Sequence, residues 1–152
     1  MSDGVTIGVE SADRADVHAL LQAVTTWSEA LYPPESRHGL DLAAYARPDV
    51  TLLVARAAGD VVGCGAWQLQ SDGSAEVKSM FVLPDARGCG IGRAILAAIE
   101  TALRGRVTTL RLETGIKQDA ALRLYESAGF RRRGPFGSYR VDPLSVFMEK
   151  PL

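Results

Sequence analysis

Cysteine and histidine are scarce in this chain of 152 residues, which holds two of each, Cys64, Cys89, His18 and His38. Two cysteines cannot build a disulfide framework, and no pair has zinc-ligand spacing, so we expect no structural metal. No apolar run approaches the roughly 20 residues that a membrane-spanning helix needs. The N-terminus lacks a basic segment followed by an apolar one, and no signal peptide is visible. We therefore expect a cytoplasmic protein that does not bind a membrane.

An excess of charge of one sign is also missing. The chain has 17 Lys and Arg against 18 Asp and Glu, for a net charge of -1. This balance gives no bulk attraction to nucleic acid, and the longest basic run, residues 131–133, fits a solvated strand edge. The hydrophobic fraction of 47% and the charged fraction of 23% are ordinary for a globular protein. At this length we expect one domain over residues 1–152.

The spacing of apolar residues predicts a mixed α/β fold with an antiparallel first half. Short β-rich runs bounded by turn residues predict strands over residues 5–9, 51–57, 61–69, 75–83, 107–113, 130–132 and 145–149. Helical spacing predicts a helix that carries Val17 to Trp27, a short helix over 41–46, and helices over 90–103 and 118–127. Three strands joined by short turns indicate a meander, which a strand–helix–strand crossover follows.

A glycine-rich turn, Arg87-Gly88-Cys89-Gly90-Ile91-Gly92-Arg93, joins one of these strands to the helix over residues 90–103. A strand that leads through such a turn into a helix presents several backbone N–H groups at one point. The helix dipole adds partial positive charge there. Glycines also remove the Cβ atoms that would block close approach of a pyrophosphate. The turn therefore predicts a phosphate-binding site.

The first alternative for this turn is a dinucleotide-binding motif of the form G-x-G-x-x-G. Gly88 and Gly90 match its first two glycines, and Glu113 lies at a plausible distance for a ribose contact. Arg93 stands at the third glycine position, however, where a side chain would obstruct close packing of helix and strand. Residues 84–87 also separate the strand from the glycines, whereas the dinucleotide turn is tighter. A P-loop is excluded, because no Gly-Lys-Ser/Thr follows.

The turn instead resembles the acetyl-coenzyme A signature Q/R-x-x-G-x-G/A of the GNAT superfamily of N-acetyltransferases. Residues 75–84 resemble the family's fourth strand and its proline, and residues 110–114 resemble its fifth strand. Residues 121–130 resemble its helix ending in L-Y-x-x-x-G-F. The pieces occupy residues 75–130 in the family's order. The resemblance implies a mixed, largely antiparallel sheet of six to seven strands with splayed fourth and fifth strands, flanked by about four helices.

The resemblance also implies acetyl-CoA as the co-substrate, without a metal. The pyrophosphate would lie on N–H groups at the helix start, and the pantetheine arm would pair with the exposed edge of the fourth strand. A backbone N–H of that edge would polarise the thioester carbonyl. Gln118 stands where the family often has Asn and could hydrogen-bond the arm. The expected cofactor-binding residues are Met80, Phe81, Val82, Arg87, Gly88, Cys89, Gly90, Ile91, Gly92, Arg93 and Gln118.

Two residues are candidates for proton transfer. By resemblance, Tyr125 would protonate the departing thiolate; the alternative is a tyrosine that only packs beneath its helix. Glu76 is the candidate general base, acting directly or through water, and its alternative role is a salt bridge with Lys78 on a solvated face. Regular alternation along the strand would place Glu76 on one face with Lys78, Met80 and Val82.

The acceptor site is expected between the loop over residues 32–40 and the segment before the last strand, which wall this site in the family. The candidate acceptor-binding residues are Tyr32, Glu35, Arg37, His38, Glu113, Phe136 and Tyr139. The resemblance predicts transfer of an acetyl group to a primary amine of a small molecule, peptide or protein by direct attack in a ternary complex. A homodimer is compatible with it, and a catalytically silent acyl-CoA sensor is the alternative.

Overall fold

A computed structural model describes residues 4–152 and contains a seven-stranded sheet in the order β1-β2-β3-β4-β5-β7-β6. The strands are β1 (Val5–Val9), β2 (Val50–Ala57), β3 (Asp60–Leu69), β4 (Ser74–Val82), β5 (Thr109–Gly115), β6 (Arg131–Arg133) and β7 (Ser145–Pro151). The α-helices are α1 (Ala15–Leu31), α2 (Ile91–Leu103) and α3 (Asp119–Ser127). The fourth predicted helix is a 3₁₀ helix, Leu42–Ala46, and two more 3₁₀ turns cover Pro34–Ser36 and Pro84–Ala86.

The pairing directions match the predicted meander and crossover. Strands β1 to β4 pair antiparallel in sequence order, and β5, β7 and β6 form a second antiparallel group. In the sheet the two groups meet at the parallel pair of β4 and β5, which α2 connects. At the β2–β3 turn, Ala58 and Gly59 both have positive φ, +51° and +87°, which is the geometry that a two-residue hairpin loop requires.

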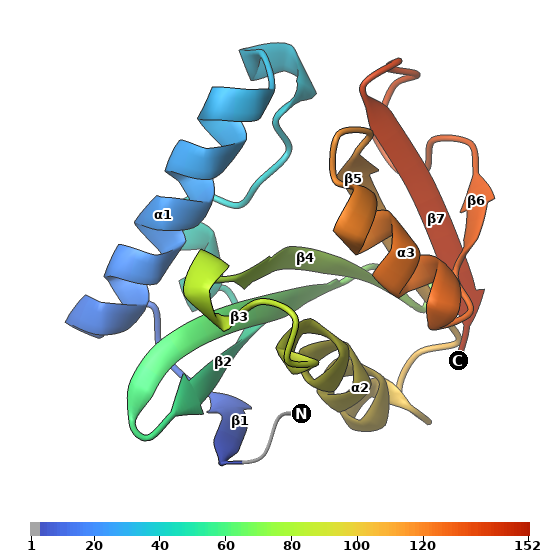
Figure 1. The fold of residues 1–152 in the computed structure, drawn as a ribbon. Helices are drawn as coiled ribbons and strands as arrows, with labels where there is room; N and C mark the ends of the chain where they lie inside the picture. Colours follow the sequence, from blue (N-terminus) through green and yellow to red (C-terminus); the bar gives the residue numbers. More distant parts are fainter. Residues whose placement is uncertain (1–3) are drawn as a thin grey trace.

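Helices cover both faces of the sheet (Figure 1). On one face α1 packs Val17, Leu20 and Leu21 against β2, β3 and Phe81 of β4. On the other face the buried side chains of α2 and α3 form the larger apolar cluster. Gly65 of β3 lets α2 approach closely, because an added Cβ there would lie 2.5 Å from the Ile95 side chain.

A β-bulge interrupts β4 at its centre. Cys64 of β3 pairs with Phe81 and Ala66 pairs with Lys78, so Ser79 and Met80 together oppose the single residue Gly65. Ser79 has φ +58°, which is uncommon for a residue other than glycine. The extra residue breaks the alternation of side chains. The prediction that Glu76 and Lys78 share a face with Met80 and Val82 was therefore wrong. Met80 and Val82 pack against the apolar cluster of α2, and Met80 also reaches the cleft beside α1 that Glu76 and Lys78 line.

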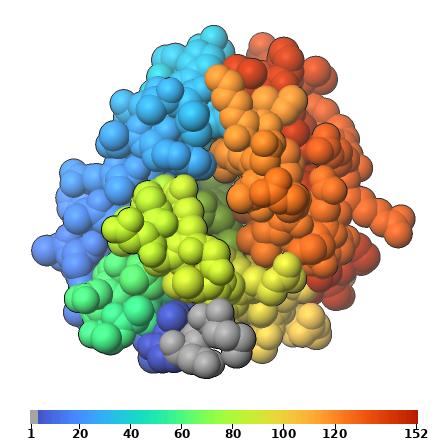
Figure 2. All heavy atoms as spheres, in the orientation of Figure 1, coloured from blue at the N-terminus to red at the C-terminus, as the bar shows by residue number. Residues whose placement is uncertain are grey.

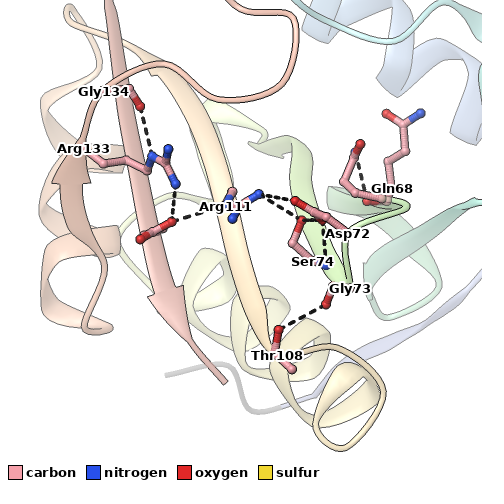
Figure 3. A network of polar contacts seen from close by, with 10 residues as sticks. Gln68, Asp72, Gly73, Ser74, Thr108, Arg111, Arg133 and Gly134 are labelled. Atoms are coloured by element: carbon pink, nitrogen blue, oxygen red, sulfur yellow. Dashed lines mark hydrogen bonds and ion pairs between the residues drawn. The ribbon is translucent and has the colours of Figure 1, made fainter.

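Strands β4 and β5 are joined over a short length and then diverge (Figure 1). Only residues 74–77 of β4 pair with residues 109–112 of β5, which confirms the predicted splay. At the joined end, Arg111 donates hydrogen bonds to Asp72 and to Glu149 (Figure 3), and Arg133 also donates to Glu149. The Arg111–Asp72 bond links the two groups of strands at the closed end of the splay, and the bonds to Glu149 hold β5, β6 and β7 together.

Candidate active site

The glycine turn leads into the N-terminus of α2 as predicted. Gly88 and Gly90 both have φ +83°, and Gly90 is the residue that precedes the helix. The Ala94 N–H bonds the Gly90 carbonyl, so the N–H groups of residues 91–93 precede the first intrahelical bond of α2. The residues 87–90 are exposed. This arrangement of N–H groups and helix dipole suits a pyrophosphate.

The side chain of Arg87 turns inward, toward the sheet and α1. Its Nε donates to the Val82 carbonyl at 2.8 Å, and its guanidinium lies over the rings of Phe81 and Trp27 at 5.4 and 5.9 Å. Arg87 thereby fixes the turn to β4 and to α1. The Arg93 guanidinium donates to the Ser127 hydroxyl at 2.9 Å and so links α2 to α3.

A cleft of about 740 Å³ lies where β4 and β5 diverge, and α1 forms its other wall. In the space-filling view the α1 segment (blue) and the β5–α3 segment (orange) meet above it (Figure 2). Phe81, Val82 and residues 87–93 lie outside the lining of the cleft, which brings together nine of the other residues of the predicted site. They are Tyr32, Arg37, His38, Glu76, Met80, Glu113, Gln118, Tyr125 and Tyr139.

Tyr125 of α3 is 5% exposed and packs edge-to-face on Phe130, with ring centroids 5.8 Å apart. Burial raises the pKa of its hydroxyl, and the nearby Glu113 carboxylate raises it further, so the phenol stays protonated in neutral solution. Among residues 4–152 no hydrogen-bond partner of this hydroxyl is found, although Tyr125 lines the cleft. The Tyr125 ring can therefore pack on Phe130 while its hydroxyl stays free to contact a ligand.

Glu76 belongs to a buried polar cluster in the cleft wall. It is 6% exposed, and its Oε2 accepts hydrogen bonds from Lys78 Nζ at 3.1 Å and from the Tyr139 hydroxyl. Lys78 Nζ also donates to the Tyr139 hydroxyl at 3.1 Å. The expected pair of Glu76 and Lys78 thus exists, but it faces the cleft and not bulk solvent. No sequence pattern indicates that Tyr139, 63 residues away, completes this cluster.

The candidate acceptor residues divide between two clefts. Tyr32 and Arg37 line the first, and Arg37 Nε donates to the Tyr32 carbonyl at 2.9 Å. Glu35 and Phe136 line only a second cleft of about 1080 Å³, next to the segment between β6 and β7. His38 and Tyr139 line both clefts, and their rings meet edge-to-face at 5.0 Å. The two clefts therefore adjoin at the cluster of Glu76, Lys78 and Tyr139.

Glu113 of β5 carries a pKa above its ordinary value, because burial disfavours its charge more than Lys78 and His38 favour it. A carboxyl group with a raised folded pKa stabilises the fold below its unfolded pKa of about 4.3, and this contribution is lost as pH rises through the folded value. We expect Glu113→Gln to raise Tm at pH 7, by ~2–4 °C per kcal/mol relieved, and to leave it unchanged at pH 4. Thermal unfolding at both pH values checks this, and equal Tm values at pH 7 would contradict it.

The described residues meet neither the requirements of a metal site nor those of a membrane-spanning helix. Across residues 4–152 no three His, Cys, Asp or Glu side chains gather in a way that could hold a metal ion. Within the same residues no helix has the length and apolar character needed to cross a bilayer.

A mixed sheet that splays beside a glycine-rich helix start defines a class of proteins that bind coenzyme A. Comparisons with known proteins specify the family. Residues 48–132, more than half of the chain, match the family model for the acetyltransferase (GNAT) domain. An IAA acetyltransferase from Azospirillum brasilense is 49% identical over 150 residues, which cover 97% of this chain and 98% of that protein. The chain belongs to the GNAT acetyltransferases.

Solved structures agree with this assignment. A Klebsiella pneumoniae protein assigned as an acyl-CoA N-acyltransferase is 40% identical, with a TM-score of 0.81 over 97% of both chains. A GNAT acetyltransferase from Elizabethkingia anophelis, solved with acetyl-CoA bound, shares the fold at 19% identity, with a TM-score of 0.72 over 99% of both chains. The protein is an acetyl-CoA-dependent N-acetyltransferase, as the sequence predicted.

Tyr45 and Ser79 are among the cleft residues that sequence reasoning missed. The Tyr45 hydroxyl lies 2.6 Å from the Ser79 hydroxyl, and both residues line the cleft. Ser79 sits in a run that reads as an uninterrupted strand, and Tyr45 lies in a short helix 34 residues before it. No local pattern connects them.

Proposed function

We propose that the protein transfers the acetyl group to a primary amine by direct attack on the thioester, with Tyr125 as general acid and Glu76 as general base. The observation that carries this proposal is the cleft at the splay of β4 and β5. It holds both the Glu76 cluster and a protonated Tyr125 hydroxyl that has no hydrogen-bond partner among residues 4–152. A proton donor for the leaving thiolate and a proton acceptor for the ammonium are thus available in one cleft.

The donor would lie across the splay. The pyrophosphate would occupy the turn over residues 88–93, and the pantetheine arm would run along the diverging edge of β4 at Met80–Val82. Gln118, which precedes α3 and lines the cleft, would bond the arm from the other side. An N–H of the β4 edge would stabilise the oxyanion that forms when the amine attacks.

The acceptor would enter from the second cleft. The two clefts meet at Tyr139, His38 and Glu76. An amine that enters there would meet the Glu76 carboxylate on its way to the thioester. Glu113, which lines the first cleft, would orient the amine by a hydrogen bond. The volume of the second cleft suits either a small molecule or the end of a peptide.

Neither cysteine is placed to form an acetyl-enzyme. Cys64 is fully buried, and burial raises the pKa of its thiol to about 12. Cys89 is exposed in the glycine turn and does not line the cleft. Because the thiolate is the nucleophilic form, direct attack by the amine is favoured over a covalent intermediate. An exposed free thiol also fits a reducing compartment, and we place the reaction in the cytoplasm.

Steady-state kinetics with a panel of primary amines tests this function. We expect intersecting double-reciprocal plots for acetyl-CoA against amine, as a ternary complex requires, whereas parallel lines would indicate an acetyl-enzyme. Glu76→Gln should lower kcat/KM for the amine by about 10²-fold near neutral pH. Because Gln cannot accept the proton, the loss should shrink as rising pH deprotonates the free amine. Glu126→Gln, at an exposed position of α3 outside the cleft lining, is the matched control. A pH-independent loss would assign Glu76 to structure alone.

A further inference from the structure

Ser79 is held in its left-handed conformation by two side chains. Tyr45 bonds its hydroxyl at 2.6 Å, and the Cys64 thiol donates to its carbonyl at 3.1 Å. Burial raises the pKa of Tyr45 to about 12 and that of Cys64 to about 12, so both groups keep their protons in neutral solution. The β-bulge of β4 is therefore fastened from a 3₁₀ helix on one side and from β3 on the other.

The two bonds to Ser79 determine the direction of the Met80 N–H. In a trans peptide the carbonyl of Ser79 and the N–H of Met80 point in opposite directions. The carbonyl turns to Cys64 on β3, so the Met80 N–H turns away from β3. The strand pairing agrees: the Leu83 N–H bonds Val62 of β3, and the direction of N–H groups alternates along a strand. The Phe81 N–H therefore points toward β3, as the Leu83 N–H does. The Met80 N–H points the opposite way, toward the splay.

We propose that Tyr45 and Cys64 are positioning residues that hold Ser79 and thereby aim the Met80 N–H at the thioester carbonyl. The proposal rests on the proposed function, which places the thioester at this edge of β4. It assigns the oxyanion donor to a single N–H and explains why a serine occupies a conformation that glycine adopts more readily. Glycine would adopt it freely but would release the Tyr45 bond.

Variants at Ser79 and Tyr45 should lower kcat more than they lower stability. Ser79→Gly loses the hydroxyl but accepts the positive φ, so its Tm should stay close to that of the wild type. Its kcat should fall about tenfold, less than the 10²–10³-fold loss that removal of an oxyanion donor causes. Tyr45→Phe should give the same fall, with the Kd for acetyl-CoA unchanged, and the double variant should be no worse than either single one. Ala43→Ser, exposed on the same 3₁₀ helix, is the control and should keep full kcat.

Infrared spectroscopy tests, without an acceptor amine, whether the Met80 N–H bonds the thioester carbonyl. Infrared difference spectra of bound acetyl-CoA, labelled with ¹³C at the thioester carbonyl, should show a shift of the C=O stretch to lower frequency in the wild type. Ser79→Gly and Tyr45→Phe should lose part of that shift. An unchanged shift and unchanged kcat in both variants would overturn the proposal and leave the proposed function intact. A wild type that shows the shift but acetylates no amine would instead contradict the proposed function, while the variants' spectra still decide the role of Ser79.

Discussion

Tyr125→Phe is expected to lower kcat by about 10²-fold while the Kd for acetyl-CoA changes little. The variant removes only the hydroxyl, and general acid catalysis is typically worth 10²–10⁴-fold. Because the ring packs on Phe130 and the hydroxyl has no bond to another of the residues 4–152, Tm should also change little. Single-turnover kinetics, titration with acetyl-CoA and thermal unfolding measure the three quantities on the same samples.

A second thioester donor distinguishes acid catalysis by Tyr125 from a packing role. A thioester whose thiol has a lower pKa leaves without protonation, so the difference between Tyr125→Phe and the wild type should shrink with such a donor. A purely structural tyrosine would give the same ratio with both donors. Unchanged turnover in Tyr125→Phe with acetyl-CoA itself would assign the residue to packing beneath α3.

Gly115→Ala is expected to destabilise the protein and open the cleft. An added Cβ at Gly115 would lie 1.8 Å from the Tyr32 hydroxyl oxygen and 2.1 Å from Cζ of its ring. Tyr32 is 5% exposed, and its hydroxyl accepts a hydrogen bond from the Lys117 N–H at 3.1 Å. Overpacking of this kind costs about 1–3 kcal/mol. At ~2–4 °C per kcal/mol, differential scanning calorimetry would detect the fall in Tm.

The Tyr32 contact also bridges the splay, so the variant should affect binding. Lys117 Nζ donates to the Leu31 carbonyl at 3.1 Å, and these bonds fasten the end of α1 to the turn between β5 and α3. Expulsion of the Tyr32 ring would loosen that wall and raise the KM for the amine. Gly8→Ala is the matched control, because an added Cβ there meets no atom within 4 Å.

Second-site suppression identifies the clash as the cause. In a Tyr32→Ala background the Gly115→Ala change should cost much less stability than in the wild type, because the ring that it displaces is absent. Additive losses would show that the effect arises elsewhere in β5.

Local patterns were enough to place most elements. The two-residue loop at Ala58-Gly59 and the turn at Gly88 and Gly90 each require positive φ, and such requirements are written in a few adjacent residues. The β4–α2–β5 crossover and the helix α3, which ends at Ser127 shortly before Gly129, follow from periodicity over about ten residues. The glycine turn and the Tyr125 helix, both visible in the sequence, together indicate acetyl-CoA.

The bulge could not be predicted in this way. Residues 75–83 read as one regular strand, and regular alternation put Glu76 on the wrong face relative to Met80. The positive φ of Ser79 is maintained by Tyr45 and Cys64, which lie 34 and 15 residues away. A conformation that depends on distant side chains leaves no trace in the local sequence.

The sequence by itself determined the meander and the crossover, because turn chemistry and hydrophobic periodicity act between neighbours along the chain. Its glycine turn and Tyr125 helix also carried the resemblance that identified the family and the donor. Only the tertiary structure decided which polar groups share the cleft. Tyr139 reaches Glu76 across 63 residues, and Tyr32 reaches Lys117 across 85. Such contacts form when loops far apart in the chain are packed over one splay, and their geometry depends on the whole fold.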